Sequence, residues 1–571
     1  MSTAAAARPL PPPGAEAPPE PSPREARLAQ LEAEAFDLLV IGGGATGAGV
    51  ARDAALRGLS VALVEREDFA SGTSSRSSRL IHGGLRYLEH GHLGLVMESS
   101  LERRRLLALA PHLVRPLAFT WPVYQGARVP RWKLSAGLFL YDALSLFRNV
   151  RGYKGLSAKA VQEAEPALRR EGLEGGARYY DAATDDARLT FANALGALEA
   201  GACVLNHVEV RALVHEGARA VGARVVDRLS GRSLGVHARV LVSAAGPWTD
   251  ELRRLDEGSA RAGPAVRGSK GVHLEVPRER LGNREALTVL SPLDGRVMFI
   301  LPAGSHAIIG TTETATRAHP AQVRASESDV AYLLASANAF FPAAHLTRAD
   351  VISAWAGIRP LVAEGYGAKD APNSASREHA LHTSPSGVLA ISGGKLTTYR
   401  LMARDAVDAV ERALGRAHRR TPHRRTPTES LPLPGGALAS VEAEVLLARR
   451  AGVPAPSAEH LVHAYGQRWR QVWAHAQATP SLAEPLCPGL PYLLAEVLHG
   501  ARAELVHTLA DLLVRRLKVA FETRDNGRAA ARAAAGVLAP ALGWDAPELQ
   551  RQLAAYDADA QRLFGIDPSD S

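Results

Sequence analysis

Cysteine is almost absent from this chain, and so is any long apolar stretch. Only Cys203 and Cys487 occur among its 571 residues. At most one disulfide could form, so a disulfide-stapled scaffold is excluded and a reducing compartment is favoured. No apolar run approaches the ~20 residues that a helix needs to cross a bilayer, so the sequence predicts no membrane-spanning helix.

Lysine is also scarce in this chain. The chain carries 67 Lys and Arg residues together, of which only seven are Lys. Because Arg stands wherever a generic cation is enough, the remaining lysines are candidates for positions that require an ammonium group. The seven are Lys133, Lys154, Lys159, Lys270, Lys369, Lys395 and Lys518.

Several catalytic patterns are missing as well. The sequence has no CxxC, no HExxH and no clustered Cys and His ligands, so we predict no metal site. Walker A and GxSxG patterns are also absent. The basic, Pro-containing segment 416–436 has no aromatic residue between its arginines, which argues against a nucleic-acid partner; we expect it to be a solvated linker.

What is present is the composition of an ordinary globular protein, with 46% hydrophobic and 22% charged residues. The net charge of +8 favours anionic partners such as acidic membrane surfaces or anionic substrates. The first 30 residues are rich in Pro and Ala, lack the apolar core of a secretory signal and contain acids that a transit peptide avoids. We therefore expect residues 1–33 to be a disordered tail.

A nucleotide-binding pattern stands near the front of the chain. The apolar run FDLLVI (36–41) predicts a buried strand, a helix follows to Gly58, and LSVALVE predicts a second strand that ends on Glu65. Between strand and helix, Gly42 allows a tight turn, Gly44 lets the backbone approach a pyrophosphate, and Gly47 permits close packing. Glu65 can accept hydrogen bonds from a ribose, which favours FAD or NAD over NADP.

Two later segments also run from an apolar strand into glycine, namely ARVLVSAAGPW (238–248) and VLAISGGKLTTYR (388–400). A loop rich in Ser and Thr follows Glu65. Three strand-to-glycine junctions that converge on one ligand are more than a simple NAD domain requires, so the pattern favours FAD.

A set of motifs, in this order, resembles the FAD-dependent glycerol-3-phosphate dehydrogenase family of the aerobic, quinone-linked type. They are GGGATGAG, TSSRSSRLIHGGLRYLE, DAATDDARL, AAGPW, IIGTT, AGIRPL and SGGKLTTYR. The resemblance spans about residues 35–415, with a weaker match in 431–436 and 496–521. HGGLRYLE and GGKLTTYR are far more distinctive than the glycine fingerprint.

The resemblance implies an α/β fold, α+β overall, with a Rossmann-like FAD-binding domain, an antiparallel-sheet substrate domain and a C-terminal helical domain. The oxidoreductase region would cover 34–415. Within it, a discontinuous FAD-binding domain would take about 34–120, 185–265 and 355–415, and the substrate domain mainly 266–354. The helical domain would cover 437–571.

The implied activity is oxidation of sn-glycerol 3-phosphate to dihydroxyacetone phosphate. A hydride would pass from C2 to N5 of a non-covalently held FAD, and a quinone would accept the electrons. Two alternatives stay open: an oxidase that uses O₂, and a non-catalytic flavin-binding scaffold. An amino-acid oxidase of the same broad fold pairs a carboxylate and would not need so many cations.

The substrate phosphate requires cations. Arg359 lies in an apolar segment, where an Arg is unfavourable unless it pairs with an anion. Lys395 is expected in the first turn of a helix over 392–414, where a cation opposes the helix dipole unless an anion sits there. By resemblance, Arg86, Tyr87 and Arg377 join them in the substrate site, although Arg86 could instead brace the flavin loop.

The catalytic residues are expected to be His273, Arg359 and Lys395, with His273 as the base for the substrate hydroxyl. His82 is the alternative base, but we expect it to pack against the flavin. Arg79 stands where the family more often has Lys. The expected cofactor-binding residues are Gly42, Gly44, Ala45, Thr46, Gly47, Glu65, Thr73, Ser74, Ser78, Arg79, Leu80, His82, Val208, Ala245, Gly246, Trp248, Gly394, Lys395, Leu396 and Thr397.

Segment 131–151 is apolar, contains Trp132, Phe139 and Phe147, and is basic at both ends. It could lie in a membrane interface or pack as an amphipathic helix on its own domain. The resemblance favours the first, so we expect a cytoplasmic protein that binds peripherally to the cytoplasmic face of the inner membrane. A homodimer is compatible with the sequence.

Overall fold

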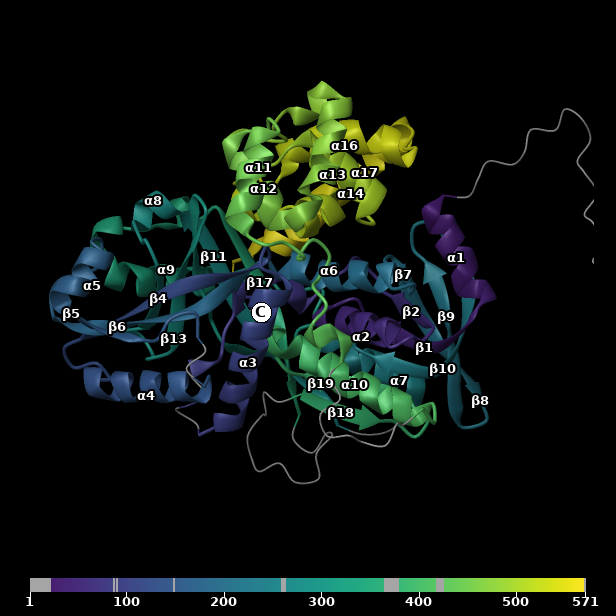
Figure 1. Cartoon of the computed structure of the whole chain (residues 1–571), viewed down its shortest axis with the longest axis horizontal. Coiled ribbons are helices and arrows are strands. Elements are labelled where there is room, and N and C mark those ends of the chain that lie inside the picture. The colour runs from purple at the N-terminus through teal and green to yellow at the C-terminus, as the bar shows by residue number, and fades with distance from the viewer. Residues whose placement is uncertain are drawn as a thin grey trace, which may run out of the picture.

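Two β-sheets lie side by side, and a bundle of helices covers both of them from above (Figure 1). The structure is a computed structural model that describes residues 22–85, 88, 91–146, 149–257, 263–363, 379–416 and 426–568. In the described part of the chain, no helix is both long and apolar enough to cross a bilayer. Cys203 and Cys487 are both free and buried.

The first sheet has the strand order β18-β19-β10-β1-β2-β7, extended by the antiparallel strands β8 and β9. Its strands are β1 (Ala35–Ile41), β2 (Val61–Val64), β7 (Cys203–Leu205), β8 (Val208–Glu216), β9 (Arg219–Asp227), β10 (Ser233–Ser243), β18 (His379–Thr383) and β19 (Leu389–Gly393). The strands β7, β2, β1, β10 and β19 run parallel, so their carboxyl ends share one edge.

Three of the helices that pack on this sheet lie next to its parallel strands and to one another. They are α2 (Ala45–Leu56), α6 (Asp186–Glu199) and α10 (Tyr399–Ala413). The central strands are buried on both faces, which explains why β1 and β2 read as continuous apolar runs rather than alternating ones. The predicted strand–helix–strand unit at the front of the chain is confirmed.

The second sheet is mainly antiparallel, in the order β15-β11-β14-β13-β12-β4-β6-β3, with β17 beside β11 and β5 beside β6. Its strands are β3 (Leu80–Ile81), β4 (Val114–Tyr124), β5 (Lys154–Ser157), β6 (Leu173–Thr184), β11 (Val266–Pro277), β12 (Ala286–Leu290), β13 (Val297–Ala303), β14 (His306–Gly310), β15 (Thr314–Thr316) and β17 (Ser353–Val362).

This sheet draws on more of the chain than expected. The sequence places the substrate domain mainly in 266–354, but β4, β5 and β6 join it from 114–184, and β17 continues to residue 362. The long β4–β6 pair connects to the rest through a parallel contact of β4 with β12. Such long-range pairing is not encoded in the local apolar pattern, so the boundary at residue 120 is wrong.

Further helices lie around the second sheet. They are α3 (Leu93–Leu109), α4 (Arg131–Leu144), α5 (Ala158–Ala164), α8 (Arg278–Leu281) and α9 (Glu327–Phe340). In Figure 1, α4 runs along the lower edge of this half, with α3 close to its inner end. Helix α7 (Thr249–Glu257) instead follows β10 and packs on β8 of the first sheet.

The C-terminal domain is helical, as expected. Its helices are α11 (Val441–Arg450), α12 (Ala455–Tyr465), α13 (Trp469–Ala478), α14 (Leu494–Ala503), α15 (Val519–Glu522), α16 (Arg528–Leu542) and α17 (Ala546–Phe564), with a π-helical turn, η10 (Asp511–Arg516). The chain then pairs β20 (Ile566–Asp567) with β16 (Ala325–Ser326) of the substrate half.

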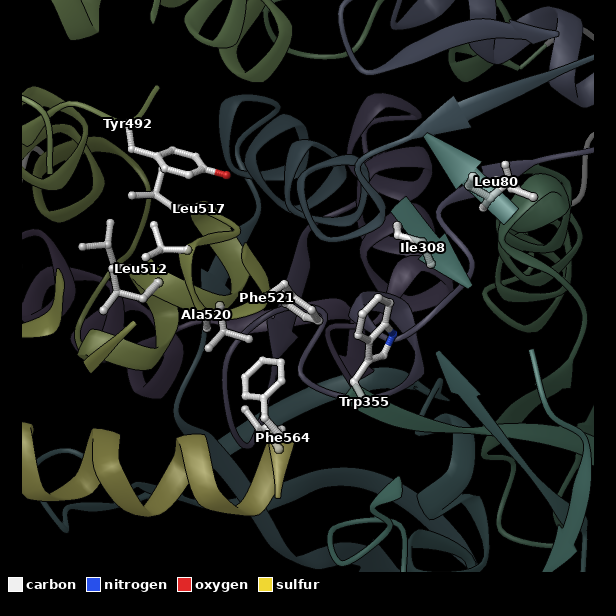
Figure 2. Packing of buried hydrophobic residues seen from close by; sticks show 14 of the residues in the cluster. Leu80, Ile308, Trp355, Tyr492, Leu512, Leu517, Ala520, Phe521 and Phe564 are labelled. Carbon is white, nitrogen blue, oxygen red and sulfur yellow. The ribbon is translucent and has the colours of Figure 1, made fainter. Parts of the chain in front are cut away.

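Aromatic packing joins this domain to the second sheet. Figure 2 shows Trp355 of β17 beside Phe521 of α15, with Phe564 of α17 below Phe521. The Trp355 and Phe521 ring centroids are 5.1 Å apart and nearly perpendicular, and those of Phe521 and Phe564 are 4.9 Å apart. Edge-to-face contacts of this kind stabilise buried aromatic clusters beyond their area burial. The helical domain is therefore part of the same core as β17.

The expected disordered tail is wrong for residues 22–33; residues 1–21 lie outside the described part of the chain. Helix α1 (Pro23–Ala33) begins with a capping box between Ser22 and Glu25, and Pro occupies its first position. Its Leu28 and Leu31 are buried. The terminal helix therefore has both a start motif and an apolar face, which outweigh the Pro- and Ala-rich composition before it.

The expected solvated linker is wrong for residues 426–436; residues 417–425 lie outside the described part. Thr428 donates a 2.6 Å hydrogen bond to Asp53, and Arg52 donates to the carbonyls of Leu431 and Pro432. Leu433 is buried. This segment packs on α2 because buried polar groups of that helix need partners.

Candidate active site

The three strand-to-glycine junctions meet at one cavity, as the sequence predicts. The parallel strands β1, β2, β10 and β19 end at the same edge of the first sheet, and a cavity of about 300 Å³ opens there. Residues from all three junctions line it, together with the loop after β2. Crevices at the carboxyl ends of parallel strands are the usual ligand sites of such sheets.

The first junction has the backbone of a phosphate cradle. Gly42 has φ +110, and a Cβ there would lie 2.7 Å from the carbonyl oxygen of Ala244. Gly44 caps α2 and, as a glycine, offers no side chain to the N–H groups of the first turn. The N–H of Ala45 donates to the Ser74 hydroxyl at 3.0 Å. A helix start of this kind favours a bound phosphate.

A second cavity of about 270 Å³ adjoins the first, and Glu65, Ala245 and Trp248 line both. Its wall includes the apolar side chains of Ile41, Val208, Val210, Leu252 and Leu255. An apolar slot on one side of Glu65 and a phosphate cradle on the other suit the adenosine and pyrophosphate parts of a dinucleotide.

One polar atom supports this fit. The Trp248 indole nitrogen is buried, and no hydrogen-bond acceptor for it exists among the described residues. Buried donors of this kind are normally satisfied, so a ligand with acceptor oxygens is the natural partner. The residues present therefore fit the expected FAD, with the adenine side at Val208 and the phosphates at α2.

The third junction differs from its prediction. The sequence places a helix from residue 392, but α10 begins only at Tyr399. Gly393 and Gly394 adopt φ +77 and +78, a left-handed conformation that interrupts the chain before the helix. Lys395 therefore precedes a short 3₁₀ turn, lines the cavity, and donates to the Ser99 hydroxyl at 3.3 Å.

The His82-Gly83 segment closes the cavity from the other side. The N–H of His82 donates to the Thr397 hydroxyl, and that hydroxyl donates back to the His82 carbonyl, both at 3.1 Å. The N–H of Gly83 donates to the Tyr141 hydroxyl at 2.9 Å, and a Cβ at Gly83 would collide with that hydroxyl. The glycine pair thus permits close approach, while Arg86 and Tyr87 lie outside the described residues.

His273 occupies the wall of the cavity from β11. Its Nε2 lies 2.8 Å from the Ser78 hydroxyl, and its ring stacks on Trp355 at 5.4 Å between centroids. Burial lowers the pKa of His273 to about 3, and the nearby cations Arg359 and Arg79 add to this. The imidazole is therefore neutral near pH 7, which leaves it able to accept a proton.

Arg359 projects from β17 toward the same cavity. Its guanidinium donates to the Thr311 hydroxyl at 3.0 Å. Gly271 makes room for it, since a Cβ there would lie 2.6 Å from Arg359 Nη2. The structure thus brings His273, Arg359 and Lys395 to one cavity, whereas Arg377 lies outside the described residues.

The other expected cofactor residues divide into three groups. Gly44, Ala45, Thr46, Glu65, Thr73, Ser74, Ser78, Leu80, His82, Ala245, Gly246, Trp248, Gly394, Lys395, Leu396 and Thr397 line the first cavity, and Gly42 and Val208 line the second. Gly47 lines neither cavity. A Cβ at this position would lie 1.9 Å from the Gly42 carbonyl oxygen, so a glycine is needed for the close packing of α2.

Arg79 was expected to bind the cofactor, but it lines neither of these two cavities. Its guanidinium donates to Glu275 at 3.0 Å and lies over the rings of Trp355 and Phe521, at 5.1 and 4.7 Å from their centroids. The Arg79 side chain therefore points to the C-terminal domain and not to either cavity. Buried Glu275 needs a cation, and that need is invisible in the sequence.

Sequence reasoning also missed a third cavity, of about 430 Å³. It shares Ser78, His82 and Arg359 with the first cavity and extends to α4. Its apolar lining includes Leu85, Leu88, Trp121, Leu134, Leu140 and Phe299. These side chains come from β4, β13, α4 and the loop after His82, so no local pattern could have grouped them.

Comparisons with known proteins agree with this geometry. Residues 37–400 match the family described as FAD dependent oxidoreductase, and residues 426–549 match the C-terminal domain of alpha-glycerophosphate oxidase. The chain is 41% identical over 561 residues to glycerol-3-phosphate dehydrogenase 2 of Mycobacterium bovis, covering 96% of this chain and 92% of that protein.

Two further relatives extend the match. The mitochondrial glycerol-3-phosphate dehydrogenase of Homo sapiens is 37% identical over 557 residues, which cover 94% of this chain and 74% of that protein. The crystal structure of glycerol-3-phosphate dehydrogenase from Bacillus halodurans complexed with FAD aligns with a TM-score of 0.78 at 32% identity, covering 95% of this chain and 97% of that one. With both regions matched and relatives aligned over almost its full length, the chain belongs to the FAD-dependent glycerol-3-phosphate dehydrogenase family, and its cofactor is FAD.

Proposed function

We propose that this protein oxidises sn-glycerol 3-phosphate to dihydroxyacetone phosphate and passes the electrons to a quinone. The observation that carries the proposal is the meeting of two cations, Arg359 and Lys395, with the neutral base His273 on the wall of the FAD cavity. A phosphorylated alcohol needs this combination: a pair for its dianion and an acceptor for its hydroxyl proton. The names of the relatives point to the same substrate.

FAD would supply the hydride acceptor, taking the hydride of C2 at N5. The residues of the chain do the rest. Arg359 and Lys395 bind the phosphate, with Arg86, Tyr87 and Arg377 as further substrate contacts implied by the family resemblance. The hydroxyl proton would reach Nε2 of His273 through the Ser78 hydroxyl, which lies 2.8 Å from Nε2 and would take the substrate proton as it gives up its own.

The charge of the substrate would also tune the base. Burial and Arg359 together hold the pKa of His273 low. A bound phosphate dianion would offset the positive charge of Arg359, which raises the pKa of His273 and makes it a stronger base. Bound substrate would therefore make proton transfer to His273 more favourable.

The third cavity supports a quinone as acceptor. It begins at Ser78, His82 and Arg359, has walls that are mainly apolar, and reaches α4. A quinone ring with an apolar tail suits such a passage better than a small polar acceptor does.

The surface beyond that cavity supports peripheral membrane binding. Exposed apolar side chains gather on the neighbouring helices α3 and α4 and on the turn after α4. They are Leu93, Met97, Trp132, Phe139, Leu140, Leu146 and Val150. Arg131, Lys133 and Arg151 are exposed beside them and suit acidic lipid headgroups. Helix α4 also packs on its own domain through Leu134, Leu138 and Tyr141. Its buried face thus fits the interpretation as a packed amphipathic helix, and its exposed face fits the interpretation as a membrane-interface helix.

Anaerobic addition of glycerol 3-phosphate to the FAD-loaded protein tests the activity. We expect the flavin band near ~450 nm to bleach. An unbleached flavin would defeat the proposal and favour a flavin-binding scaffold.

Stopped-flow reoxidation of the reduced protein then separates the acceptors. A soluble quinone should reoxidise the flavin much faster than O₂ does. Rapid reoxidation by O₂ alone would make the protein an oxidase.

A further inference from the structure

Three cations of the C-terminal domain enter the FAD-binding half of the molecule. Arg515 and Arg516 are the last residues of η10, Lys518 follows after Leu517, and all three cations are buried. Arg515 and Arg516 both pair with Asp68, at 2.6 and 2.8 Å. The loop that follows β2 is thus held by charges from the C-terminal domain, although none of the residues described in that domain lines the first cavity.

Lys518 has a more direct relation to the site. Its ammonium lies 3.0 Å from Asp185 and 3.2 Å from Asp186, the two adjacent acids of the DAATDDARL motif. Burial alone would raise the pKa of Asp185, but Lys518 and the N–H of Arg188 bring it below its usual value. Without the ammonium, the fully buried carboxylate of Asp186 would lose its cation beside the half-buried carboxylate of Asp185, which is unfavourable.

Asp186 connects Lys518 to Ser77, in the loop that follows β2. One oxygen of Asp186 faces Lys518, and the other accepts hydrogen bonds from the N–H of Ser77 at 3.1 Å and from its hydroxyl at 2.7 Å. The Ser77 hydroxyl in turn accepts from the N–H of Arg79 at 3.0 Å. Asp186 therefore holds Ser77 directly, and the Ser77 hydroxyl holds the backbone of Arg79.

The middle residue of this turn is Ser78, the partner of His273. Arg79 adopts φ +54, a left-handed conformation that costs a non-glycine residue free energy and persists only under strong local constraints. The Asp186 bonds supply such a constraint. The direction of the Ser78 hydroxyl thus depends on a chain of contacts that begins at Lys518.

We infer that Lys518 is a positioning residue of the active site: through Asp186 and Ser77 it orients Ser78 toward His273 and the flavin cavity. This inference rests on the proposed function, because the base is assigned there. It gives the C-terminal domain a role in the reaction. It also explains one of the seven lysines, since a compact ammonium fits between two carboxylates where a planar guanidinium fits less well.

Three full-length variants test the inference. Lys518→Met removes the charge and keeps the length of the side chain, and Ser77→Ala breaks the chain at its next step. Lys159→Met is the matched control, because the Lys159 side chain is 87% exposed. For each, we would measure the visible circular dichroism of bound FAD, the FAD dissociation constant, and kcat and KM for glycerol 3-phosphate.

We expect Lys518→Met to lower kcat by about 10–100-fold with little change in KM, because misplacement of a catalytic group by ~1 Å costs this much. The flavin dichroism should change, and FAD should bind more weakly. Ser77→Ala should act in the same direction, and the double variant should lose less than the product of the two effects, since both act on one chain of contacts. Lys518→Arg should restore part of kcat.

A Lys518→Met protein with wild-type kcat, FAD affinity and dichroism would overturn the inference, as would effects that multiply fully in the double variant. Should Lys518→Met fail to fold, Ser77→Ala alone decides: a wild-type kcat and unchanged flavin dichroism would reject the inference. If glycerol 3-phosphate leaves the wild-type flavin unbleached, the proposed function fails, while the FAD affinity and dichroism still test the positioning role.

Discussion

The Ser78 hydroxyl lies 2.8 Å from Nε2 of His273, although 195 positions separate the two residues. Ser78 belongs to the loop that follows the first strands of the FAD-binding sheet, and His273 belongs to β11 of the second sheet. The proposed base is therefore assembled from both halves of the molecule. A shift of one half against the other would separate the base from its partner.

Gly310 should be indispensable for this contact. A Cβ at position 310 would collide with the His273 ring, which cannot retreat because it stacks on Trp355. We expect Gly310→Ala to lower kcat by about 10–100-fold while FAD remains bound. Gly235→Ala is the control, since nothing lies within 4 Å of a Cβ there. Steady-state kinetics with equal FAD content would decide, and a normal kcat in Gly310→Ala would remove His273 from the reaction.

Arg359 should contribute mainly to substrate binding. Arg359→Ala is expected to weaken the binding of glycerol 3-phosphate by ~2–5 kcal/mol, because a charge-paired phosphate in a partly buried site loses its partner. The dissociation constant of the product, which carries the same phosphate, can be measured from the change that it causes in the flavin spectrum under anaerobic conditions. Arg224→Ala, at an exposed position of β9, serves as the control. An unchanged affinity in Arg359→Ala would place the phosphate elsewhere.

His112 should make the fold sensitive to acid. Burial, followed by the charges of Arg188 and His463, lowers the pKa of His112 from 6.5 to about 3. Between these two values the unfolded chain binds a proton that the folded chain does not, so the free energy of unfolding falls as the pH falls below 6.5. From pH 7 to pH 5 this histidine should cost about 2 kcal/mol of stability.

Urea unfolding of wild type and His112→Gln at both pH values measures this contribution. The variant cannot titrate at position 112, so it should lose about 2 kcal/mol less than the wild type on acidification. Equal losses in the two proteins would show that His112 already carries its proton, or is accessible, in the folded state.

The buried ion pairs of η10 should contribute more to the free energy of unfolding than ion pairs on the surface do. Arg516 and Asp68 are fully buried, so Arg516→Met leaves a carboxylate without one of its cations and should cost about 3–5 kcal/mol. Arg551→Met removes a pair with Glu548 in which the Arg side chain is 66% exposed, and should cost less than about 1 kcal/mol. Denaturant titration compares the two; similar costs would mean that Asp68 gains water or Arg515 compensates fully.

The apolar surface of α3 and α4 should bind lipid. Trp132 and Phe139 are 74% and 57% exposed, so the double variant Trp132→Ser, Phe139→Ser should bind vesicles that contain acidic lipid much more weakly in sedimentation assays. The matched control is Leu446→Ser with Leu447→Ser, which removes two exposed apolar side chains of α11. Equal vesicle binding by both double variants would place the membrane surface elsewhere.

Local patterns account well for the nucleotide-binding unit. Gly42, Gly44 and Glu65 lie within a short segment, and each has a task that depends on its neighbours in sequence. The missed elements show two different causes. Helix α1 carried its own start motif, Ser22 to Glu25, which composition concealed; the late start of α10 followed from the left-handed Gly393 and Gly394, a conformation that the residue type permits but does not require.

The sequence by itself determined the family, the cofactor and the identity of the residues at the three glycine junctions, because these depend on short stretches whose chemistry is local. Tertiary structure alone decided which charges serve the site and which serve the fold. Arg359 faces the cavity, whereas Arg79 pairs with Glu275 and Lys518 with Asp185 and Asp186. The sequence does not show which anion a given cation pairs with, because the buried carboxylates near it are brought there by long-range packing.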